Sequence, residues 1–379
     1  MKTLKDLQDV RGKRVFLRVD FNVPLEHGRI TDYYRIEKAL PTIQNLRARG
    51  AKIILASHIE NKEGAAPSMA APTLGPVYSY LRGMFGGDLI FVENYFPEKI
   101  NEAVAGQQEG QIVLLENLRK YPQEKDNDDI FAKHLASFAD IYVNDSFAAD
   151  HRKHASIVGI PKHIPGCTGL LVDNEVKHLS MAFNPPHPFL FILGGAKFDT
   201  KLPLVKKFLG LADKVFVGGA LANDLFKAKG FEVGKSLLSE NADISDIIGS
   251  EKLILPADVV ISNEQGSKTV LPTEVTKKDL IVDSGERTLE ALKNVIAEAE
   301  CILWNGPLGN FEIGFSKGTE ELAKMISESH AKTIIGGGDT LASISKLGLE
   351  KSFTFVSTGG GAMLDFLANG TLPALEALN

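Results

Sequence analysis

The sequence predicts an α/β protein of two domains, each a parallel sheet flanked by helices. Three observations support this prediction. The chain has 379 residues, too many for one ordinary hydrophobic core. Apolar strand-like runs alternate with helical patterns in both halves, as in proteins with parallel sheets. Near the middle, a helical stretch at 170–183 followed by the proline-rich NPPHP indicates a connecting helix with stiff ends.

Strands and helices alternate throughout the first half. Five apolar runs read as strands: KRVFLRVD (13–20), AKIILAS (51–57), DLIFVEN (88–94), QIVLLENLR (111–119) and DIYVNDSF (140–147). Helical patterns lie between them, among them RIEKALPTIQNLRARG (35–50) and DDIFAKHLASFA (128–139). This half is therefore expected to form one parallel sheet.

In the second half, apolar runs lead directly into glycines. There are five: FLFILGGAK from 189, KVFVGGALAN from 214, CILWNGPLGN from 301, TIIGGGDT from 333 and FTFVSTGGGA from 353. Unbroken Val, Ile, Leu and Phe suit a strand that is covered on both faces. Glycine next allows the backbone to approach a ligand closely. Since helical patterns follow most of these clusters, the loops and helix N-termini are predicted to converge on an anion such as phosphate.

Composition restricts the class of protein. A net charge of −6, a pI near 5.9 and a mean hydropathy of −0.02 argue against general binding to nucleic acid or to a membrane surface. The N-terminal segment lacks the apolar core of a signal peptide, so a cytoplasmic protein is expected. Cys167 and Cys301 have no metal-type spacing, and we expect ordinary core thiols.

Arginine is distributed unevenly. Ten arginines precede Pro186 and only Arg287 follows it. Four of the ten lie at or soon after strand ends or at a helix start: Arg18, Arg35, Arg119 and Arg152. One such residue alone is as well explained by a solvated surface position. Four together favour a site for a small anion in the first half, opposite a nucleotide site in the glycine-rich half.

Two familiar nucleotide signatures are absent. The stretch GFEVGKS resembles a Walker loop, but only three residues separate Gly230 from Gly234 and no apolar strand precedes it. No GxGxxG follows the first strand. The sequence therefore supports neither a P-loop fold nor a dinucleotide-binding fold.

Seven motifs in order, spanning nearly the whole chain, resemble the phosphoglycerate kinase family: RVDFNVP, LLENLR, YVNDSF…HRKHAS, GGAKFDTK, WNGPLGNFE, GGGDT and VSTGGGA. The resemblance implies two Rossmann-like domains joined by a hinge helix. It places 3-phosphoglycerate on residues 1–168, a linker at 169–185, Mg-ATP or Mg-ADP on residues 186–365, and a returning segment at 366–379. It further implies a glycolytic, monomeric enzyme that transfers a phosphoryl group reversibly between 1,3-bisphosphoglycerate and ADP.

The resemblance also assigns residues. Substrate contacts are expected from Arg18, Asp20, Asn22, Arg35, His58, Arg119 and Arg152. Nucleotide contacts are expected from Lys197, Lys201, Gly218, Gly219, Gly285, Glu312, Gly337, Gly338, Asp339 and Thr340. Asp339 is the expected Mg²⁺ ligand, although it also suits a helix cap. Arg35, Lys201 and the Gly360 amide are expected to be catalytic. No general base is needed, because the accepting carboxylate is already ionised at neutral pH.

The chain departs from the family pattern after Ser57 and His58. Where the family usually has leucine, glycine, arginine and proline, this chain reads IENK. Asn61 replaces the expected arginine, and Glu60 adds an unfavourable charge unless Lys62 takes the place of the missing arginine. Two alternatives to an active kinase therefore stay open: a catalytically silent relative that binds nucleotide, and a kinase for another anionic carboxylate.

Overall fold

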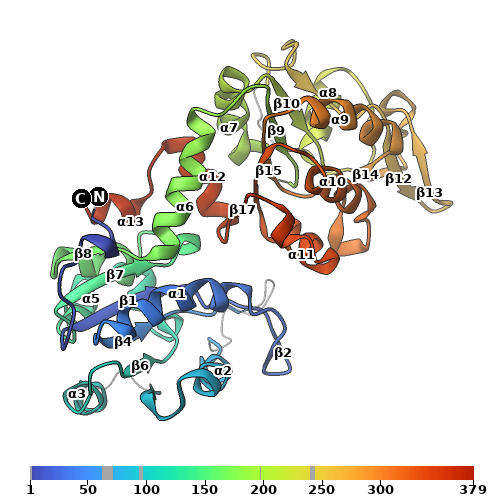
Figure 1. The fold of residues 1–379 in the computed structure, drawn as a ribbon. Helices are drawn as coiled ribbons and strands as arrows, with labels where there is room; N and C mark the ends of the chain where they lie inside the picture. Colours follow the sequence, from blue (N-terminus) through green and yellow to red (C-terminus); the bar gives the residue numbers. More distant parts are fainter. Residues whose placement is uncertain (1, 62–70, 94–96, 197, 240–243) are drawn as a thin grey trace. The chain divides into compact units, whose positions relative to one another are not determined.

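The computed structural model describes residues 2–61, 71–93, 97–196, 198–239 and 244–379. Two parallel six-stranded sheets flanked by helices confirm the predicted α/β class (Figure 1). Contacts divide the chain into two compact units, one formed by residues 1–177 with 371–379 and the other by residues 178–370. None of the described helices is long and apolar enough to cross a membrane.

The sheet of the first unit has the strand order β5-β6-β4-β1-β7-β8. These strands are β5 (Leu89–Val92), β6 (Ile112–Leu115), β4 (Lys52–Ala56), β1 (Arg14–Val19), β7 (Ile141–Asp145) and β8 (Gly166–Thr168). Every pair is parallel, so the carboxyl ends of all six strands lie along one edge. Each of the five strands expected in this half is present, and β8 is an addition at the edge of the sheet.

Helices cover both faces of this sheet. They are α1 (Tyr34–Ala48), α2 (Gly75–Phe85), α3 (Pro97–Ala105), α4 (Pro122–Lys125) and α5 (Asp129–Ala136), and a hairpin of β2 (Leu25–Glu26) and β3 (Arg29–Ile30) precedes α1. Along β1, Val15 and Leu17 belong to one hydrophobic cluster, whereas Phe16 belongs to another. Successive strand residues point to opposite faces, so a strand buried on both faces reads as an unbroken apolar run.

The chain passes from the first unit to the second within α6 (Leu170–Ser180), because the division falls between Lys177 and His178. The first unit extends to Lys177, and the chain returns to it at Thr371. The terminal helix α13 (Pro373–Ala377) is joined to this unit by a hydrogen bond from the Ala374 amide to the Asp150 carbonyl, at 3.1 Å.

The sheet of the second unit has the order β11-β10-β9-β15-β16-β17, again with every pair parallel. Its strands are β11 (Leu253–Ile254), β10 (Lys214–Val217), β9 (Phe189–Leu193), β15 (Cys301–Asn305), β16 (Lys332–Gly336) and β17 (Phe355–Val356). The five glycine clusters therefore lie at one sheet edge, as the sequence predicted.

The helices of this unit are α7 (Phe198–Leu211), α8 (Leu221–Ala228), α9 (Glu286–Glu298), α10 (Lys317–Ser327), α11 (Gly338–Leu347) and α12 (Gly360–Asn369). An antiparallel sheet of β12 (Val259–Asn263), β13 (Gly266–Val270) and β14 (Leu280–Ser284) was not foreseen from the sequence. It has its own small hydrophobic cluster, in which Val259 and Ile261 pack with Phe226 of α8.

Candidate functional site

Polar side chains gather at the carboxyl edge of the first sheet, where β1, β4 and β6 end. Two of them hold the loops in place. The Ser57 hydroxyl donates to the Val19 carbonyl at 2.8 Å and accepts from the Phe21 amide at 2.7 Å. The Asn117 side chain hydrogen-bonds both the amide and the carbonyl of Ile59, at 3.1 and 2.8 Å. The loop backbones after these strands are thereby fixed relative to one another.

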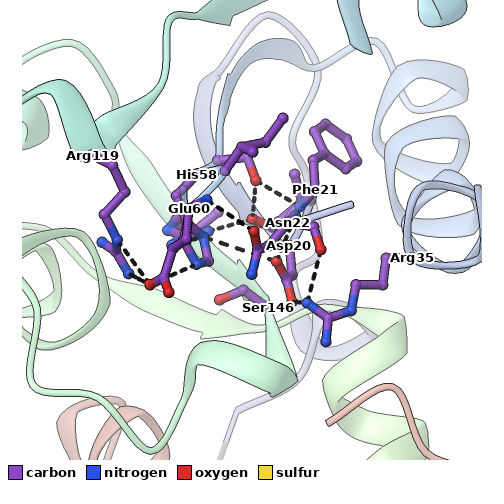
Figure 2. A network of polar contacts seen from close by, with 12 residues as sticks. Asp20, Phe21, Asn22, Arg35, His58, Glu60, Arg119 and Ser146 are labelled. Atoms are coloured by element: carbon purple, nitrogen blue, oxygen red, sulfur yellow. Dashed lines mark hydrogen bonds and ion pairs between the residues drawn. The ribbon is translucent and has the colours of Figure 1, made fainter. Parts of the chain in front are cut away.

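Arg35 lies in the first turn of α1 and contacts the loop after β1 (Figure 2). Its Nη1 atom donates to Asp20 Oδ2 at 3.0 Å and to the Asn22 carbonyl at 3.1 Å. The Asn22 amide donates to the other oxygen of Asp20, at 2.9 Å. About a third of the Arg35 side chain is exposed, against 5% for Asp20. Part of the guanidinium is therefore open to a ligand.

Arg18 and His58 form a buried layer beneath this edge. The Arg18 side chain is fully buried and donates to Ser156 Oγ at 2.8 Å, to the Val19 carbonyl and to His58 Nδ1 at 3.1 Å. A guanidinium only donates, so Nδ1 accepts and the imidazole proton lies on Nε2. Burial, followed by the charges of Arg18 and Arg119, holds the pKa of His58 well below its ordinary value. His58 is therefore neutral at neutral pH.

Glu60 pairs with both remaining arginines, and Figure 2 shows its carboxylate beside Arg119. Its Oε1 atom accepts from Nε and Nη2 of Arg119, both at 3.2 Å, and forms an ion pair with Nη1 of Arg152. Partial burial raises the pKa of Glu60, but hydrogen bonds and charge from Arg152 and Arg119 outweigh it and hold the pKa below its ordinary value. Lys62 lies outside the described residues, and the structure instead pairs Glu60 with two of the predicted site arginines.

A buried carboxylate that the sequence reading missed supports Arg119 from the opposite side. Glu124 is fully buried, accepts from the amide and the hydroxyl of Ser156 at 2.9 and 2.6 Å, and lies 3.8 Å from Nη1 of Arg119. Glu124 begins no motif and ends no strand, so its sequence carries no signal of this role. Its place is decided by the packing of α4 beneath the arginines.

In the second unit, a cavity of about 270 Å³ opens at the carboxyl edge of the sheet. Among the residues expected to bind nucleotide, the described lining includes Gly219, Glu312 and Asp339. The remaining walls are largely apolar side chains: Phe226, Leu237, Val259, Ile281, Val282, Leu308 and Phe311. A cavity with apolar walls, bare backbone and a few polar groups suits a small organic ligand with one flat, weakly polar part.

The glycines of this edge have different structural reasons. Gly219 has a φ of +59°, and a Cβ there would lie 2.7 Å from the Gly195 amide nitrogen. A side chain would therefore collide with the backbone of the loop after β9. At Gly285, a Cβ would lie 2.3 Å from the Asp258 carboxylate, which accepts from backbone amides at the start of α9. Close packing accounts for Gly285, and the described cavity lining does not include it.

Lys201, on α7, donates from Nζ to the Gly194 carbonyl at 2.9 Å. Burial lowers its pKa to about 8, against the opposing effect of the Asp339 carboxylate. The ammonium therefore stays charged at neutral pH, poorly hydrated and available to an anion. Lys197, the neighbouring predicted lysine, lies outside the described residues.

The N-termini of α11 and α12 lie next to each other. A Cβ on Gly360 would be 3.2 Å from the Gly337 Cα and 3.4 Å from the Gly338 nitrogen. Thr340 is buried, and its hydroxyl accepts from the Gly306 amide at 3.1 Å. Its hydroxyl thus ties the loop after β15 to α11. The first amides of a helix have no partner within that helix, so two adjoining helix N-termini favour a polyanion.

The donor set at this edge fits Mg²⁺ bound together with a nucleotide. Within the part of the chain that the structure describes, no group of three or more acidic, His or Cys side chains could hold a metal alone. Asp339 is exposed at the start of α11 and also lines the cavity. Mg²⁺ in nucleotide sites commonly takes one or two carboxylates, with phosphates and water as its other ligands.

Asp283 at the end of β14 is a cavity residue that was not predicted. It accepts from the amides of Gly318 and Ser284, both at 2.9 Å, and burial raises its pKa to about 6. An aspartate that ends the apolar run LIVD was a signal available in the sequence.

Comparison with known proteins agrees with this geometry. The family model described as phosphoglycerate kinase matches residues 4–370. The phosphoglycerate kinase of Dictyoglomus turgidum is 41% identical over all of this chain and 98% of its own, and that of Pelotomaculum thermopropionicum is 39% identical with the same coverage. The solved phosphoglycerate kinase of Pyrococcus horikoshii matches with a TM-score of 0.86 and 31% identity, covering 100% of this chain and 98% of its own. With a two-unit α/β fold, an arginine-lined edge in one unit and a glycine-lined cavity in the other, the chain belongs to the phosphoglycerate kinase family.

Proposed function

We propose that this chain transfers a phosphoryl group reversibly between 1,3-bisphosphoglycerate and ADP, giving 3-phosphoglycerate and ATP. The observation that carries the proposal is the pairing of two chemically different edges in one chain. One edge has four arginines: Arg18, Arg35, Arg119 and Arg152. The other has a largely apolar cavity next to Lys201 and the N-termini of α11 and α12. Such a pair suits a small acidic substrate and a nucleotide.

The glycerate is assigned to the first unit. Arg35, partly exposed and aligned by Asp20, contacts the carboxylate and the phosphoryl group that is transferred. Arg119 and Arg152 bind the phosphate that remains on the glycerate. Arg18 has no exposed surface, so it acts through His58 as a positioning residue, rather than as the direct contact that the sequence suggested.

The nucleotide is assigned to the second unit. The base occupies the cavity beside Gly219, and Glu312 at its mouth accepts hydrogen bonds from the ribose hydroxyls. The phosphates extend toward Lys201 and the adjoining N-termini of α11 and α12. Asp339 would hold Mg²⁺, which would supply positive charge to the phosphates when bound. We expected residues 1–168 to bind the glycerate and residues 186–365 to bind the nucleotide. These two roles are assigned to the two units defined by contacts.

Positioning and charge are sufficient for this chemistry. The accepting carboxylate is already ionised, so no side chain has to remove a proton. As the phosphoryl group moves, negative charge spreads over its equatorial oxygens, and the Lys201 ammonium, the Arg35 guanidinium and the Gly360 amide stabilise it. These groups lie in different units, so both units have to contribute to the transfer.

A coupled assay tests the proposal directly. Purified protein is supplied with 1,3-bisphosphoglycerate, Mg²⁺ and ADP, and ATP formation is followed. Turnover at substrate concentrations below the millimolar range supports the assignment. Absence of ATP at saturating substrate, with nucleotide binding retained, would identify a catalytically silent relative. Turnover only with a different acyl phosphate would assign another carboxylate kinase.

We also propose a cytoplasmic monomer that depends on Mg²⁺. The net charge of −6, which disfavours polyanionic partners, supports the absence of nucleic-acid binding. Light scattering coupled to gel filtration checks the mass against 41.1 kDa. Removal of Mg²⁺ by a chelator should abolish turnover, and readdition of Mg²⁺ should restore it.

A further inference from the structure

We propose that Glu60 is an internal competitor for the substrate: its carboxylate occupies Arg119 and Arg152 in the free enzyme and leaves them when an anionic ligand binds. This inference rests on the proposed function, because it takes this arginine pair as the site for the phosphate of the glycerate. It adds a residue that sets substrate affinity and release.

The geometry is that of a bound anion. Oε1 of Glu60 accepts from Nε and Nη2 of Arg119 at equal distances of 3.2 Å, and from Nη1 of Arg152. One oxygen therefore takes hydrogen bonds from two guanidinium groups that come from different loops. A phosphate oxygen would use the same donors. The carboxylate and such a phosphate exclude each other.

Differences in burial indicate which partner moves. The Arg119 side chain is only 3% exposed and is supported from behind by Glu124, at 3.8 Å from its Nη1 atom. The side chains of Glu60 and Arg152 are 36% and 30% exposed. Arg119 is thus a fixed donor, whereas the Glu60 carboxylate can turn into water at little desolvation cost. A ligand displaces Glu60 rather than Arg119.

The backbone of Glu60 is held independently of its carboxylate. The Glu60 amide donates to the Asn22 side-chain oxygen at 2.9 Å, and the preceding residue, Ile59, is fixed by Asn117. The exchange therefore needs only side-chain rotation, with the loop after β4 kept in place. Because the backbone is anchored and the side chain can rotate, the Glu60 carboxylate stays at a high local concentration near the two arginines when the ligand leaves.

The charges indicate what this competition achieves. A carboxylate carries one negative charge, whereas a phosphate monoester carries nearly two at neutral pH and has more acceptor oxygens. The phosphate displaces Glu60, but part of its binding free energy is spent on breaking the internal ion pairs. Glu60 therefore weakens ligand binding and speeds release, without contacting the reacting atoms.

The test compares the wild type with Glu60→Gln and Glu60→Ala. Calorimetry measures binding of 3-phosphoglycerate, and separately of inorganic phosphate, at fixed ionic strength. We expect both ligands to bind both variants roughly two- to fivefold more tightly, the size typical of a partly exposed ion pair. The KM for 3-phosphoglycerate should fall by a similar factor. The kcat of the variants should equal that of the wild type, or should fall if product release limits turnover.

Glu109→Gln is the matched control, because Glu109 forms a Glu–Arg pair with Arg11 at 3.0 Å on the surface of the same unit. It removes the same charge and should leave both affinities unchanged. Thermal unfolding of all variants reports their folding. Weaker or unchanged binding by the folded Glu60 variants would overturn the proposal and make Glu60 an aligning residue for the arginines.

The inorganic phosphate measurement separates this inference from the proposed function. Tighter phosphate binding by the Glu60 variants supports the internal competitor even in a wild type that forms no ATP from 1,3-bisphosphoglycerate. Active wild type with no gain in affinity on removing the Glu60 charge refutes the internal competitor alone.

Discussion

Replacing Lys201 with methionine should separate catalysis from stability. Methionine keeps much of the length and apolar volume of the side chain but lacks the ammonium. In phosphoryl transfer, a placed cation contributes roughly 10³- to 10⁵-fold to the rate. If Lys201 stabilises the transferring group, kcat for ATP formation should fall by at least about 10³-fold in the coupled assay, whereas nucleotide binding should weaken much less.

The stability of the same variant should not fall. Burial holds the pKa of Lys201 at about 8, against an ordinary value of 10.5. At 1.36 kcal/mol for each pH unit, this difference corresponds to a cost of about 3 kcal/mol for keeping the ammonium charged in the folded protein. Methionine removes that cost and also the hydrogen bond to the Gly194 carbonyl, worth about 1 kcal/mol. At pH 7, the free energy of unfolding should therefore rise by about 2 kcal/mol.

The advantage of the methionine variant should depend on pH. Between pH 8 and 10.5 the folded wild type loses the Lys201 proton, whereas the unfolded chain still holds it. Stability rises with pH wherever the unfolded state binds more protons. The free energy of unfolding of the wild type should therefore rise toward that of the variant over this range. The two values should become equal by about pH 10. Urea unfolding of the ligand-free proteins at several pH values measures this convergence.

Lys214→Met is the control, because Lys214 is an exposed lysine of the same unit that also donates to a backbone carbonyl, that of Glu251 at 3.3 Å. Its stability should stay within about 0.5 kcal/mol of the wild type, with no special pH dependence. Near-normal turnover by Lys201→Met would refute the catalytic role. A loss of stability at pH 7 would refute the reasoning about burial.

Three further changes test other parts of the two sites. Arg35→Ala removes a proposed substrate contact and leaves the nearly buried Asp20 without its ion-pair partner. The kcat/KM for 3-phosphoglycerate in the ATP-consuming direction should therefore fall by about 10²-fold or more. An unchanged value would exclude Arg35 from the site. Gly219→Val places a side chain within 2.8 Å of the Pro307 carbonyl oxygen, so ADP binding measured by calorimetry should weaken at least about tenfold while 3-phosphoglycerate binding is kept. Glu124→Ala leaves the buried amide and hydroxyl of Ser156 without their acceptor and removes the opposite charge 3.8 Å from the Arg119 guanidinium. It should lower the free energy of unfolding by about 3 kcal/mol in a urea titration; a loss below about 1 kcal/mol would contradict the proposed support of the arginines.

Local patterns in the sequence were sufficient for most of the fold. β9 and β15 are read correctly because every residue in them is buried, and the only polar residue in the two strands is Asn305, the last of β15. The glycines that follow were also predicted to lie at one edge, since all strands of a parallel sheet end on the same side. The antiparallel sheet of β12, β13 and β14 was missed. β13 is largely exposed and reads GSKTV, which has no continuous apolar run.

Single residues of the site were harder to interpret than the motifs that contain them. Arg18 begins the motif RVDFNVP and was expected to contact the substrate, yet it has no exposed surface. Gly285 was expected to contact the nucleotide, and close packing against Asp258 is a separate structural reason for a glycine there. Both observations depend on how closely other elements pack around the residue, and those elements are distant in the chain.

The sequence by itself determined the α/β class, the placing of arginines in one half and glycines in the other, and the anomalous charge at Glu60. These follow from hydrophobic periodicity and from the chemistry of residue types, which act over a few neighbouring positions. Only the tertiary structure decided what Glu60 does. Its partners lie 59 and 92 residues further along the chain, and whether a carboxylate repels a ligand or occupies the ligand's own arginines depends on side chains that folding alone brings within hydrogen-bonding distance.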